Sequence, residues 1–421
     1  MTKHSRLATA LVASTAFLAL ASAASAADLR MSWWGGDSRH VATQEALKVC
    51  GAKYGHTVAA EFTGFQGHLE KLTAQIAGGT EADIVQVNWP WLPLFSKKGD
   101  GFADISQLKG FDLSQFDPAQ LQSATIDGKL NGVPVSTTGR VFLFNKDVFD
   151  KAGLPLPKTW DELIADAKVF KEKLGPDYYP FEAIILNALL IVQLVTEQAT
   201  GKSMVDPEKM VINWTPEELR KGIEFYQNLV ATGAIRPWKV AAGEGKVELF
   251  EMKAWADGKI AGSYEWDSTY SKYADPLKGQ KLVPAEPLVI ADAKTPGLYR
   301  KPSMVFSISK HSKNPEAAAQ ILNCLLNEPE GVSILKLSRG IPTSKAAYEA
   351  LKASGDIKGP VAEANAIVMA TDGPAVTPFD EDPRVRDVFQ STLESVAYEQ
   401  ISAADAAVEM IDQWNDILSR L

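Results

Sequence analysis

Residues 128–147, GKLNGVPVSTTGRVFLFNKD, decide how the rest of the chain is organised. The first part, 128–134, contains glycine, Asn-Gly and proline, which are turn and edge-strand residues. Residues 141–144, VFLF, form an apolar run without polar alternation, typical of a strand buried on both faces. The polar residues 136–140, STTGR, lie between. This pattern indicates either one strand with a polar bulge, or a strand that leaves one lobe, crosses the floor of a cleft and enters a second lobe.

The length of 421 residues favours two lobes, because one hydrophobic core rarely organises so long a chain. Hydrophobic residues make up 46% and charged residues 23%, which is ordinary for a globular protein. We find no internal repeats and no low-complexity segment.

The N-terminus has the features of a secretory signal peptide. Two cations in the first six residues precede the short apolar run 7–20, and residues 24–26, ASA, offer a cleavage site. We therefore predict a signal peptide over residues 1–26, a mature chain from Ala27, and a periplasmic protein. With no cysteine near the cleavage site, a lipid anchor is not expected.

The charge argues against nucleic acid as a partner. The formal charge of -9 becomes -11 without the signal peptide, with 41 basic against 52 acidic residues. An anionic small ligand stays open, because a few cations in a cleft dominate locally. Five histidines without ligand spacing and only two cysteines indicate no metal site, and no cofactor is predicted.

Apolar periodicity predicts β-α-β-α-β at the start of the mature chain. The strands are expected at 29–34, 57–62 and 82–87, with helices at 43–54 and 66–77. Such spacing is typical of a parallel, doubly wound sheet, in which ligands bind beyond the carboxyl ends of the strands. Further along, we expect helices at 160–174, 183–198, 215–232 and 314–327, and strands at 258–266 and 303–309.

No strong catalytic motif is present. The patterns HExxH, CxxC, GxSxG and the P-loop are missing from the sequence. A pair of carboxylates for glycoside hydrolysis stays open, because such pairs have no fixed spacing. A secreted pectin- or glycan-cleaving enzyme is therefore the alternative to a binding protein.

Aromatic and polar residues gather at the predicted strand ends. Indole rings stack on sugar faces, and sugar hydroxyls need donors and acceptors. The candidates are Trp89, Tyr264 and Trp266 for stacking, and Gln66, Asn88, Thr138 and Glu265 for hydroxyls. Burial in a core is the other interpretation of the aromatic residues, and we favour it for Trp33.

Cations lie at comparable positions. Because a guanidinium pairs bidentately with a carboxylate, these residues would suit an acidic sugar. Solvated surface charge is the alternative, weakest for the arginine next to the apolar strand. The candidates are Arg39, Arg140, Arg300, Lys301 and Arg339.

The mature chain resembles the extracellular solute-binding proteins of carbohydrate ABC transporters, the group that contains maltose-binding protein. The pieces that carry the resemblance, in order, are WGGD at 34–37, LTAQIAGGTEADIV at 72–85, NGVP at 131–134, FNKD at 144–147, AGL at 152–154, KTWDEL at 158–163 and NPEAA at 314–318. Residues 31–36, 76–80 and 170–180 are similar to the oligogalacturonide-binding members.

The resemblance implies an α/β fold with two lobes, doubly wound sheets and a hinge, the type II periplasmic binding protein architecture. It implies a first lobe of residues 27–138 plus 291–342 and a second of 139–290 plus 343–421. The protein would capture an oligosaccharide as a monomer and deliver it to ABC transporter permease subunits with their ATPase, without chemistry of its own.

By position in the family pattern, Asp37, Asn88, Trp89, Thr138, Glu182, Tyr264 and Trp266 would line the cleft. The chain departs from the maltose binder at two places, where Thr138 and Pro90 replace acidic residues. Losing carboxylates there makes room for an anionic ligand, which favours a uronate oligosaccharide over a neutral glucan.

The resemblance also bears on the two cysteines. It returns the chain to the first lobe at the helix 314–327, so Cys50 and Cys324 belong to one lobe and their helices can pack together. Two reduced, buried thiols are the alternative. Export to an oxidising compartment favours a disulfide between them.

Overall fold

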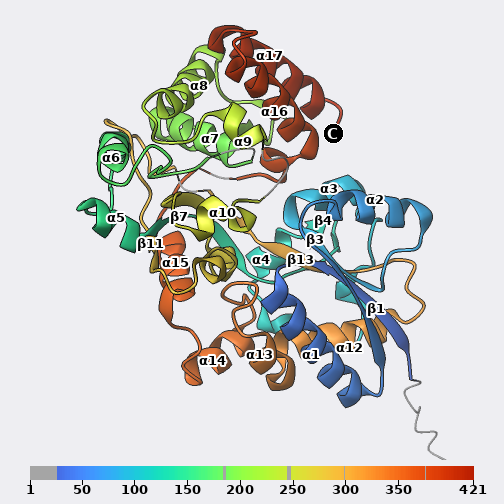
Figure 1. Ribbon diagram of the computed structural model, residues 1–421. Helices are drawn as coiled ribbons and strands as arrows, with labels where there is room; N and C mark the ends of the chain where they lie inside the picture. Colours follow the sequence, from blue (N-terminus) through green and yellow to red (C-terminus); the bar gives the residue numbers. More distant parts are fainter. Residues whose placement is uncertain (1–25, 184–185, 244–247, 298, 375) are drawn as a thin grey trace, which may run out of the picture.

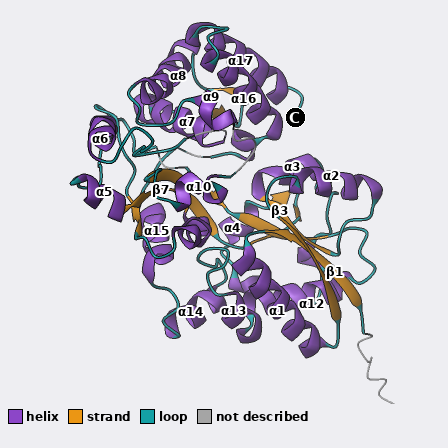
Figure 2. Cartoon of the chain, viewed as in Figure 1, coloured by secondary structure: helices purple, strands orange, loops and turns teal. Residues whose placement is uncertain are grey.

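The chain folds into two α/β bodies that lie side by side (Figure 1). The computed structural model describes residues 26–183, 186–243, 248–297, 299–374 and 376–421, so the predicted signal peptide falls almost wholly outside the described residues. The strands form two separate groups, one in each body (Figure 2). No helix among the described residues is long and apolar enough to cross a membrane.

The first sheet has five strands in the order β2-β1-β3-β13-β6. β1 pairs in parallel with β2 and β3, while β13 runs antiparallel to β3 and β6. The predicted β-α-β-α-β pattern is therefore confirmed. The bounds are β1 (Asp28–Trp34), β2 (Thr57–Thr63), β3 (Ile84–Asn88), β6 (Val133–Pro134) and β13 (Met304–Ile308).

Helices cover the first sheet, and one disulfide joins two of them. These helices are α1 (Asp37–Tyr54), α2 (His68–Gly78), α12 (Pro315–Asn327) and α13 (Pro329–Leu335). α1 begins six residues before the predicted start at 43, with Gly36 as its N-cap. The predicted disulfide between Cys50 of α1 and Cys324 of α12 is present, with the two Cα atoms 5.8 Å apart. Both residues lie in the core of the first body.

Short elements link β3 to the stretch at 128–147. They are η1 (Trp89–Trp91), α3 (Leu92–Phe95), η2 (Ile105–Gln107), η3 (Leu113–Gln115), α4 (Pro118–Gln122), β4 (Thr125–Ile126) and β5 (Lys129–Leu130). Asp104, Asp112 and Asp117 cap η2, η3 and α4 by accepting backbone N–H bonds, which fixes these turns locally.

The second sheet is built around β7 (Thr137–Asn145), the apolar run that the sequence predicted as a buried strand. β10 (Gly262–Trp266), β11 (Leu282–Ala285) and β12 (Arg300–Pro302) all pair antiparallel with it. β6 belongs to the first sheet and β7 to the second, so residues 128–147 do connect the two sheets.

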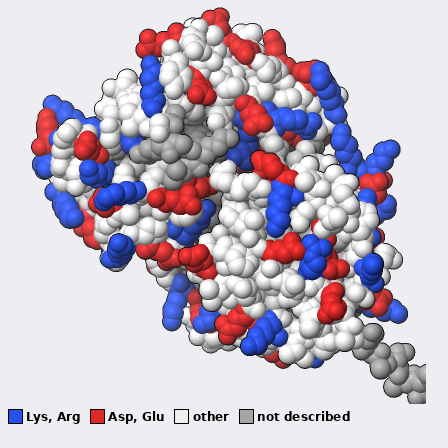
Figure 3. All heavy atoms as spheres, turned by 45° about the vertical axis from the view of Figure 1, so that its right-hand side comes forward, with Lys and Arg blue, Asp and Glu red and all other residues white. Residues whose placement is uncertain are grey.

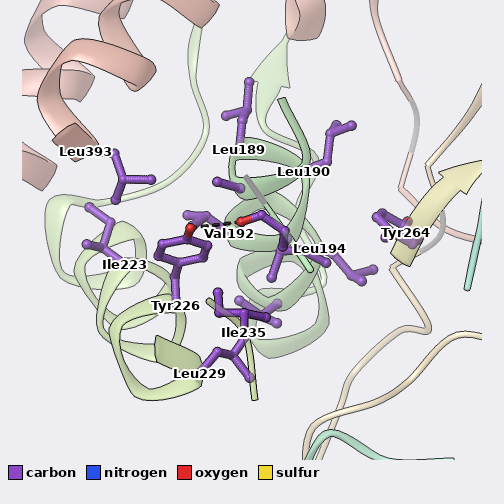
Figure 4. Packing of buried hydrophobic residues seen from close by; sticks show 14 of the residues in the cluster. Leu189, Leu190, Val192, Leu194, Ile223, Tyr226, Leu229, Ile235, Tyr264 and Leu393 are labelled. Atoms are coloured by element: carbon purple, nitrogen blue, oxygen red, sulfur yellow. Dashed lines mark hydrogen bonds between the residues drawn. The ribbon is translucent and has the colours of Figure 1, made fainter. Parts of the chain in front are cut away.

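The second body has a large apolar core made mostly by helices. Figure 4 shows the side chains of α7 (Leu186–Thr200) and α8 (Pro216–Ala231) packed together, with the Tyr226 hydroxyl donating to the Ala183 carbonyl at 2.8 Å. Thr215 caps α8 in a capping box with Glu218. The neighbouring elements are α5 (Lys146–Ala152), α6 (Trp160–Lys173), α9 (Trp238–Gly243), α16 (Pro383–Ala397), α17 (Ala403–Leu418), and the strand pair β8 (Val205–Asp206) and β9 (Val211–Ile212).

Smaller elements complete the second body around a separate apolar cluster. They are η4 (Leu249–Glu251), α10 (Lys253–Ala256), η5 (Asp267–Thr269), α11 (Tyr270–Ala274), η6 (Asp275–Leu277) and η7 (Pro378–Glu381). α15 (Gly359–Ala370) packs on β7. A Cβ at Gly139 would lie 2.5 Å from Val368 Cγ1, so only glycine allows this close approach.

Chain segments that cross between the bodies meet at two serines. The Ser136 and Ser303 hydroxyls are 2.6 Å apart, and the Ser303 N–H donates to the Ser136 carbonyl at 2.8 Å. The Ser136 hydroxyl also reaches the Arg339 carbonyl at 2.6 Å, and Ser136 bridges Pro342. α14 (Lys345–Ala353) packs on α13 in the first body, whereas α15 packs on the second sheet. The predicted lobe boundaries remain a prediction.

Candidate functional site

The antiparallel pairing of β7 brings four predicted site residues together. Arg140 lies opposite Trp266 of β10, and Thr138 lies opposite Lys301 of β12. We call Thr138, Arg140, Trp266 and Lys301 the floor cluster. It lies at the start of β7, just after the chain has left the first sheet at β6, and it includes residues of the polar stretch 136–140 that the sequence singled out.

The Trp266 indole lies close to two cations. The Arg140 guanidinium carbon is 4.9 Å from the indole ring centre, and the Lys301 ammonium is 4.6 Å from it. The Tyr299 ring packs edge-on against the indole at 5.4 Å. Trp266 is only partly buried, so part of the indole faces solvent. A partly buried indole close to two cations can stack on a sugar ring and leave charge beside it.

Arg140 is held in place by residues of the second body. It is 1% exposed, and it donates to the Asn187 side chain and the Tyr264 carbonyl. Its guanidinium lies 3.8 Å from the Glu265 carboxylate, which also accepts from Asn187 at 2.8 Å. This buried pair fixes the arginine next to Trp266.

Lys301 connects the second sheet with the first. Its ammonium is 2.8 Å from the Glu381 carboxylate of η7 and donates to the Asn88 side chain, at the end of β3, at 3.3 Å. Burial lowers the pKa of Lys301, and the Glu381 charge opposes that shift. The predicted residue Asn88 therefore lies beside the floor cluster.

Thr138 has a supporting position. Its hydroxyl donates to the Asp267 carboxylate, which also accepts from the Gly139 N–H at 3.1 Å and from Asn365 at 2.7 Å. Burial raises the pKa of Asp267, and these donors oppose the shift. Thr138 thus ties β7 to η5 and α15.

Arg39 and Arg339, which we call the arginine pair, lie on the first body. Arg39 is 8% exposed in the first turn of α1, and Arg339 is 4% exposed after α13. Arg339 donates to the Thr43 hydroxyl at 2.9 Å, and that hydroxyl donates to the Arg39 carbonyl at 2.7 Å. Burial lowers the pKa of Arg39 to about 10. Surface charge is therefore the wrong interpretation for Arg39, Arg140, Lys301 and Arg339.

One contact joins the rims of the two bodies. The exposed Gln66, after β2, donates to Glu248, before η4, at 3.0 Å. Lys272 of α11 lies 4.0 Å from Glu248 and 4.1 Å from the Phe250 ring centre. Burial lowers the pKa of Lys272, and the charges of Glu248 and Glu265 oppose that shift.

The other predicted residues lie apart from the floor cluster or are buried behind it. Asp37 is exposed at the start of α1. Trp89 is 6% exposed, packs in the first core and donates its indole N–H to the Ser123 carbonyl at 2.8 Å. Tyr264 is fully buried, with its ring 4.7 Å from the Arg140 guanidinium carbon.

Glu182 and Arg300 complete the predicted set. Glu182 is buried and accepts from Arg236, so it neutralises a second-body arginine. Arg300 is half-buried on β12 and donates to the Val368 carbonyl at 3.3 Å, toward α15.

Several polar residues of the site were not predicted. They are Asn187, Glu248, Lys272 and Glu381. Asn187, Glu248 and Lys272 come from helices or turns of the second body. There the sequence periodicity predicts secondary structure, but it does not indicate which polar residues face a cleft. Only Glu381 had a signal, because it lies in the acidic run 380–382 just before a helix.

The outer surface contrasts with the site. On the face in Figure 3, cations and anions are interspersed over both bodies. Among the described residues, no group of three or more His, Cys, Asp or Glu side chains could hold a metal ion.

The chain is similar to known proteins over most of its length. The model of the bacterial extracellular solute-binding protein family matches residues 41–332. A periplasmic oligogalacturonide-binding protein of Yersinia enterocolitica, solved with saturated digalacturonic acid, is 40% identical, with a TM-score of 0.90 over 94% of this chain and 99% of that chain.

Two curated relatives are more distant. A protein of Brucella abortus named as a binding protein is 34% identical over 176 residues, which are 40% of this chain and 42% of that protein. The chain thus spans less than half the length of that relative. The diacetylchitobiose-binding protein of Streptomyces coelicolor is 26% identical over 88% of this chain and 84% of its own length.

Proposed function

The chain belongs to the bacterial extracellular solute-binding proteins, and we propose that it captures an acidic oligosaccharide for an ABC importer. The ligand class is a short uronate oligomer such as an oligogalacturonide. The protein holds this ligand between its two bodies and delivers it to the membrane permease, without cleaving it.

The observation that carries this proposal is the position of the Trp266 indole, 4.9 Å from the Arg140 guanidinium carbon and 4.6 Å from the Lys301 ammonium. A sugar ring stacks on an indole through its C–H face. Cations close to that indole favour a ring that carries a carboxylate.

The solved relative supports the same ligand class. The Yersinia enterocolitica protein binds digalacturonic acid and matches nearly the whole chain, and our proposal extends its ligand class to this chain. The similarity of residues 31–36, 76–80 and 170–180 to the oligogalacturonide-binding members agrees with this.

Ligand capture requires two lobes that close. We propose a hinge where Ser136, Ser303 and Arg339 meet, because the polypeptide crosses between the sheets there. The proposed lobes are residues 27–138 plus 291–342 and residues 139–290 plus 343–421. α14 falls within the second range but packs on α13 of the first body. The hydrogen bond from Gln66 to Glu248, which joins the rims of the two bodies, would form on closure and break on opening.

The cellular setting follows from the family. We propose that residues 1–26 direct export, that the mature protein is a periplasmic monomer, and that its partners are permease subunits with their ATPase. The remaining alternative is a secreted enzyme that cleaves pectin or another glycan.

A thermal-shift screen tests the proposal, because a ligand that binds only the native state raises the melting temperature by mass action. Di- and trigalacturonate are expected to raise it, with smaller shifts from neutral oligosaccharides. No shift with any uronate would overturn the ligand class. Chromatography of trigalacturonate after incubation with the protein should show intact sugar, and shortened products would favour the enzyme.

A further inference from the structure

Only five cations are buried in the described parts of the chain, and they fall into two classes. Arg140, Arg236 and Lys301 each have a carboxylate partner, provided by Glu265, Glu182 and Glu381. Arg39 and Arg339, the arginine pair, have no carboxylate within 4.0 Å among the described residues. Since an uncompensated buried charge is costly, a structure that keeps two of them requires an explanation.

All protein acceptors of the arginine pair are neutral. Arg39 donates from Nε to the Ser338 carbonyl at 2.9 Å and from Nη1 to the Trp34 carbonyl at 3.5 Å. Arg339 donates from Nε to Gln86 at 3.0 Å and from Nη2 to Thr43 at 2.9 Å. These contacts hold both guanidinium groups in place without neutralising them.

Donor capacity is left over on both residues. Arg339 Nη1 is buried and has no hydrogen-bond partner. Arg39 Nη2 makes no hydrogen bond in the described chain, while its side chain keeps 8% exposure. Buried arginine N–H groups normally find acceptors, so this surplus indicates a missing anion.

The place of the arginine pair suits a ligand. Arg39 lies in the first turn of α1, which follows the carboxyl end of β1. Gln86, which accepts a hydrogen bond from Arg339, lies on β3. Ligands of such sheets bind at these strand ends. Gly36, the N-cap of α1, gives no side-chain cap, so the positive helix end adds to the cationic field.

Electrostatic effects agree with this placement. Burial lowers the pKa of Arg339 well below its ordinary value, and the Arg39 charge lowers it further. Asp37 is the nearest acidic residue in sequence to Arg39, and it is exposed and forms no ion pair with either arginine. An anion between the bodies would relieve the repulsion within the pair.

We propose that the arginine pair binds a carboxylate of the ligand, so that the first body sets the preference for acidic sugars. Arg140 and Lys301 then position Trp266 and add the smaller share of that preference, because Glu265 and Glu381 partly offset their charge. This inference depends on the proposed function, and it identifies the residues that recognise the charge of the ligand.

The test measures an affinity ratio by calorimetry, for trigalacturonate against its fully methyl-esterified, neutral form. In Arg39→Gln this ratio should fall roughly tenfold or more, the scale of a lost charge-assisted hydrogen bond. The affinity for the methyl ester should change little. Arg39→Lys keeps the charge without the planar fork, and its ratio should lie between those of Arg39→Gln and the unmodified protein.

Arg220→Gln is the matched control, because it removes one guanidinium from an exposed ion pair on α8. Its ratio should equal that of the unmodified protein. An unchanged ratio in both Arg39 variants would overturn the inference and leave the proposed function in place. No preference for the free acid in the unmodified protein would instead overturn the acidic-ligand proposal itself.

Discussion

Gln66 donates from Nε2 to Glu248 Oε1 at 3.0 Å, and this hydrogen bond joins the rims of the two bodies. Gln66 follows β2 of the first sheet, whereas Glu248 precedes η4 of the second body. The pair thus links the two bodies in the arrangement of this structure, which we propose is the closed one. Because the bond is at the rim, its net contribution is about 1 kcal/mol.

Gln66→Ala should weaken ligand binding by roughly fivefold, since about 1 kcal/mol of closed-state stabilisation is lost. Small-angle scattering of the unliganded variant should give a larger radius of gyration. Gln115→Ala removes a partly exposed glutamine that bonds to Asp112 within the first body, so it controls for the substitution. Equal affinity in both variants would mean that the rim contact does not affect closure.

Trp266→Ala should cost roughly 2 kcal/mol or more in ligand binding, the scale of a central aromatic contact. The melting temperature of the unliganded protein should change little, because the indole is partly exposed. Trp89→Ala is the contrast, since Trp89 is buried in the first core and its loss should cost about 3–5 kcal/mol of folding stability. If Trp266→Ala has a clearly lower melting temperature and an unchanged ligand affinity, the indole belongs to the core.

The disulfide of Cys50 and Cys324 lies wholly in the first body. Protein purified from the periplasm and denatured without reductant should show no titratable thiol. The double variant Cys50→Ser with Cys324→Ser should lose up to about 4–5 kcal/mol of stability, the chain-entropy figure for a very long loop. Ligand affinity should stay unchanged, because Cys50 lies near the opposite end of α1 from Arg39 and neither helix carries a residue of the floor cluster. Two free thiols would contradict the bridge.

Asp380 gives the stability a pH dependence. It is 1% exposed, and burial raises its pKa from 3.8 to about 7, although Thr377 donates two hydrogen bonds to it. Between these two pKa values the folded state binds more protons than the unfolded state. The contribution of Asp380 to the free energy of unfolding therefore falls as the pH rises from 4 to 7.

Asp380→Asn removes this titration, so the decrease of stability between pH 5 and 7.5 should be smaller in the variant than in the unmodified protein. Urea unfolding at the two pH values measures both free energies. Burial also raises the pKa of the neighbouring Glu197, so some decrease should persist. The same decrease in both proteins would show that Asp380 is ionised in the folded state at pH 5.

The sequence predicted the fold well where local periodicity decides structure. The strand at 29–34 and the helix at 314–327 correspond closely to β1 and α12. The helix at 43–54 was predicted too short, because its first turn carries Arg39 and His40 in place of apolar residues. The crossing at 136–140 was predictable because polar residues precede an apolar strand abruptly.

The site was less predictable than the fold. Arg140 and Trp266 were singled out because they adjoin strand ends, and β7–β10 pairing does bring them together. Ion-pair partners such as Glu265 and Glu381 decide which cations stay uncompensated, and these partners come from distant segments. Only the tertiary structure therefore separates the arginine pair from the other cations.

Calorimetry of the purified mature protein with trigalacturonate and with maltose tests the proposed function most directly. We expect trigalacturonate to bind more tightly, because its carboxylates meet buried cations that maltose cannot neutralise. Equal affinity for the two sugars, or a preference for maltose, would contradict the acidic ligand.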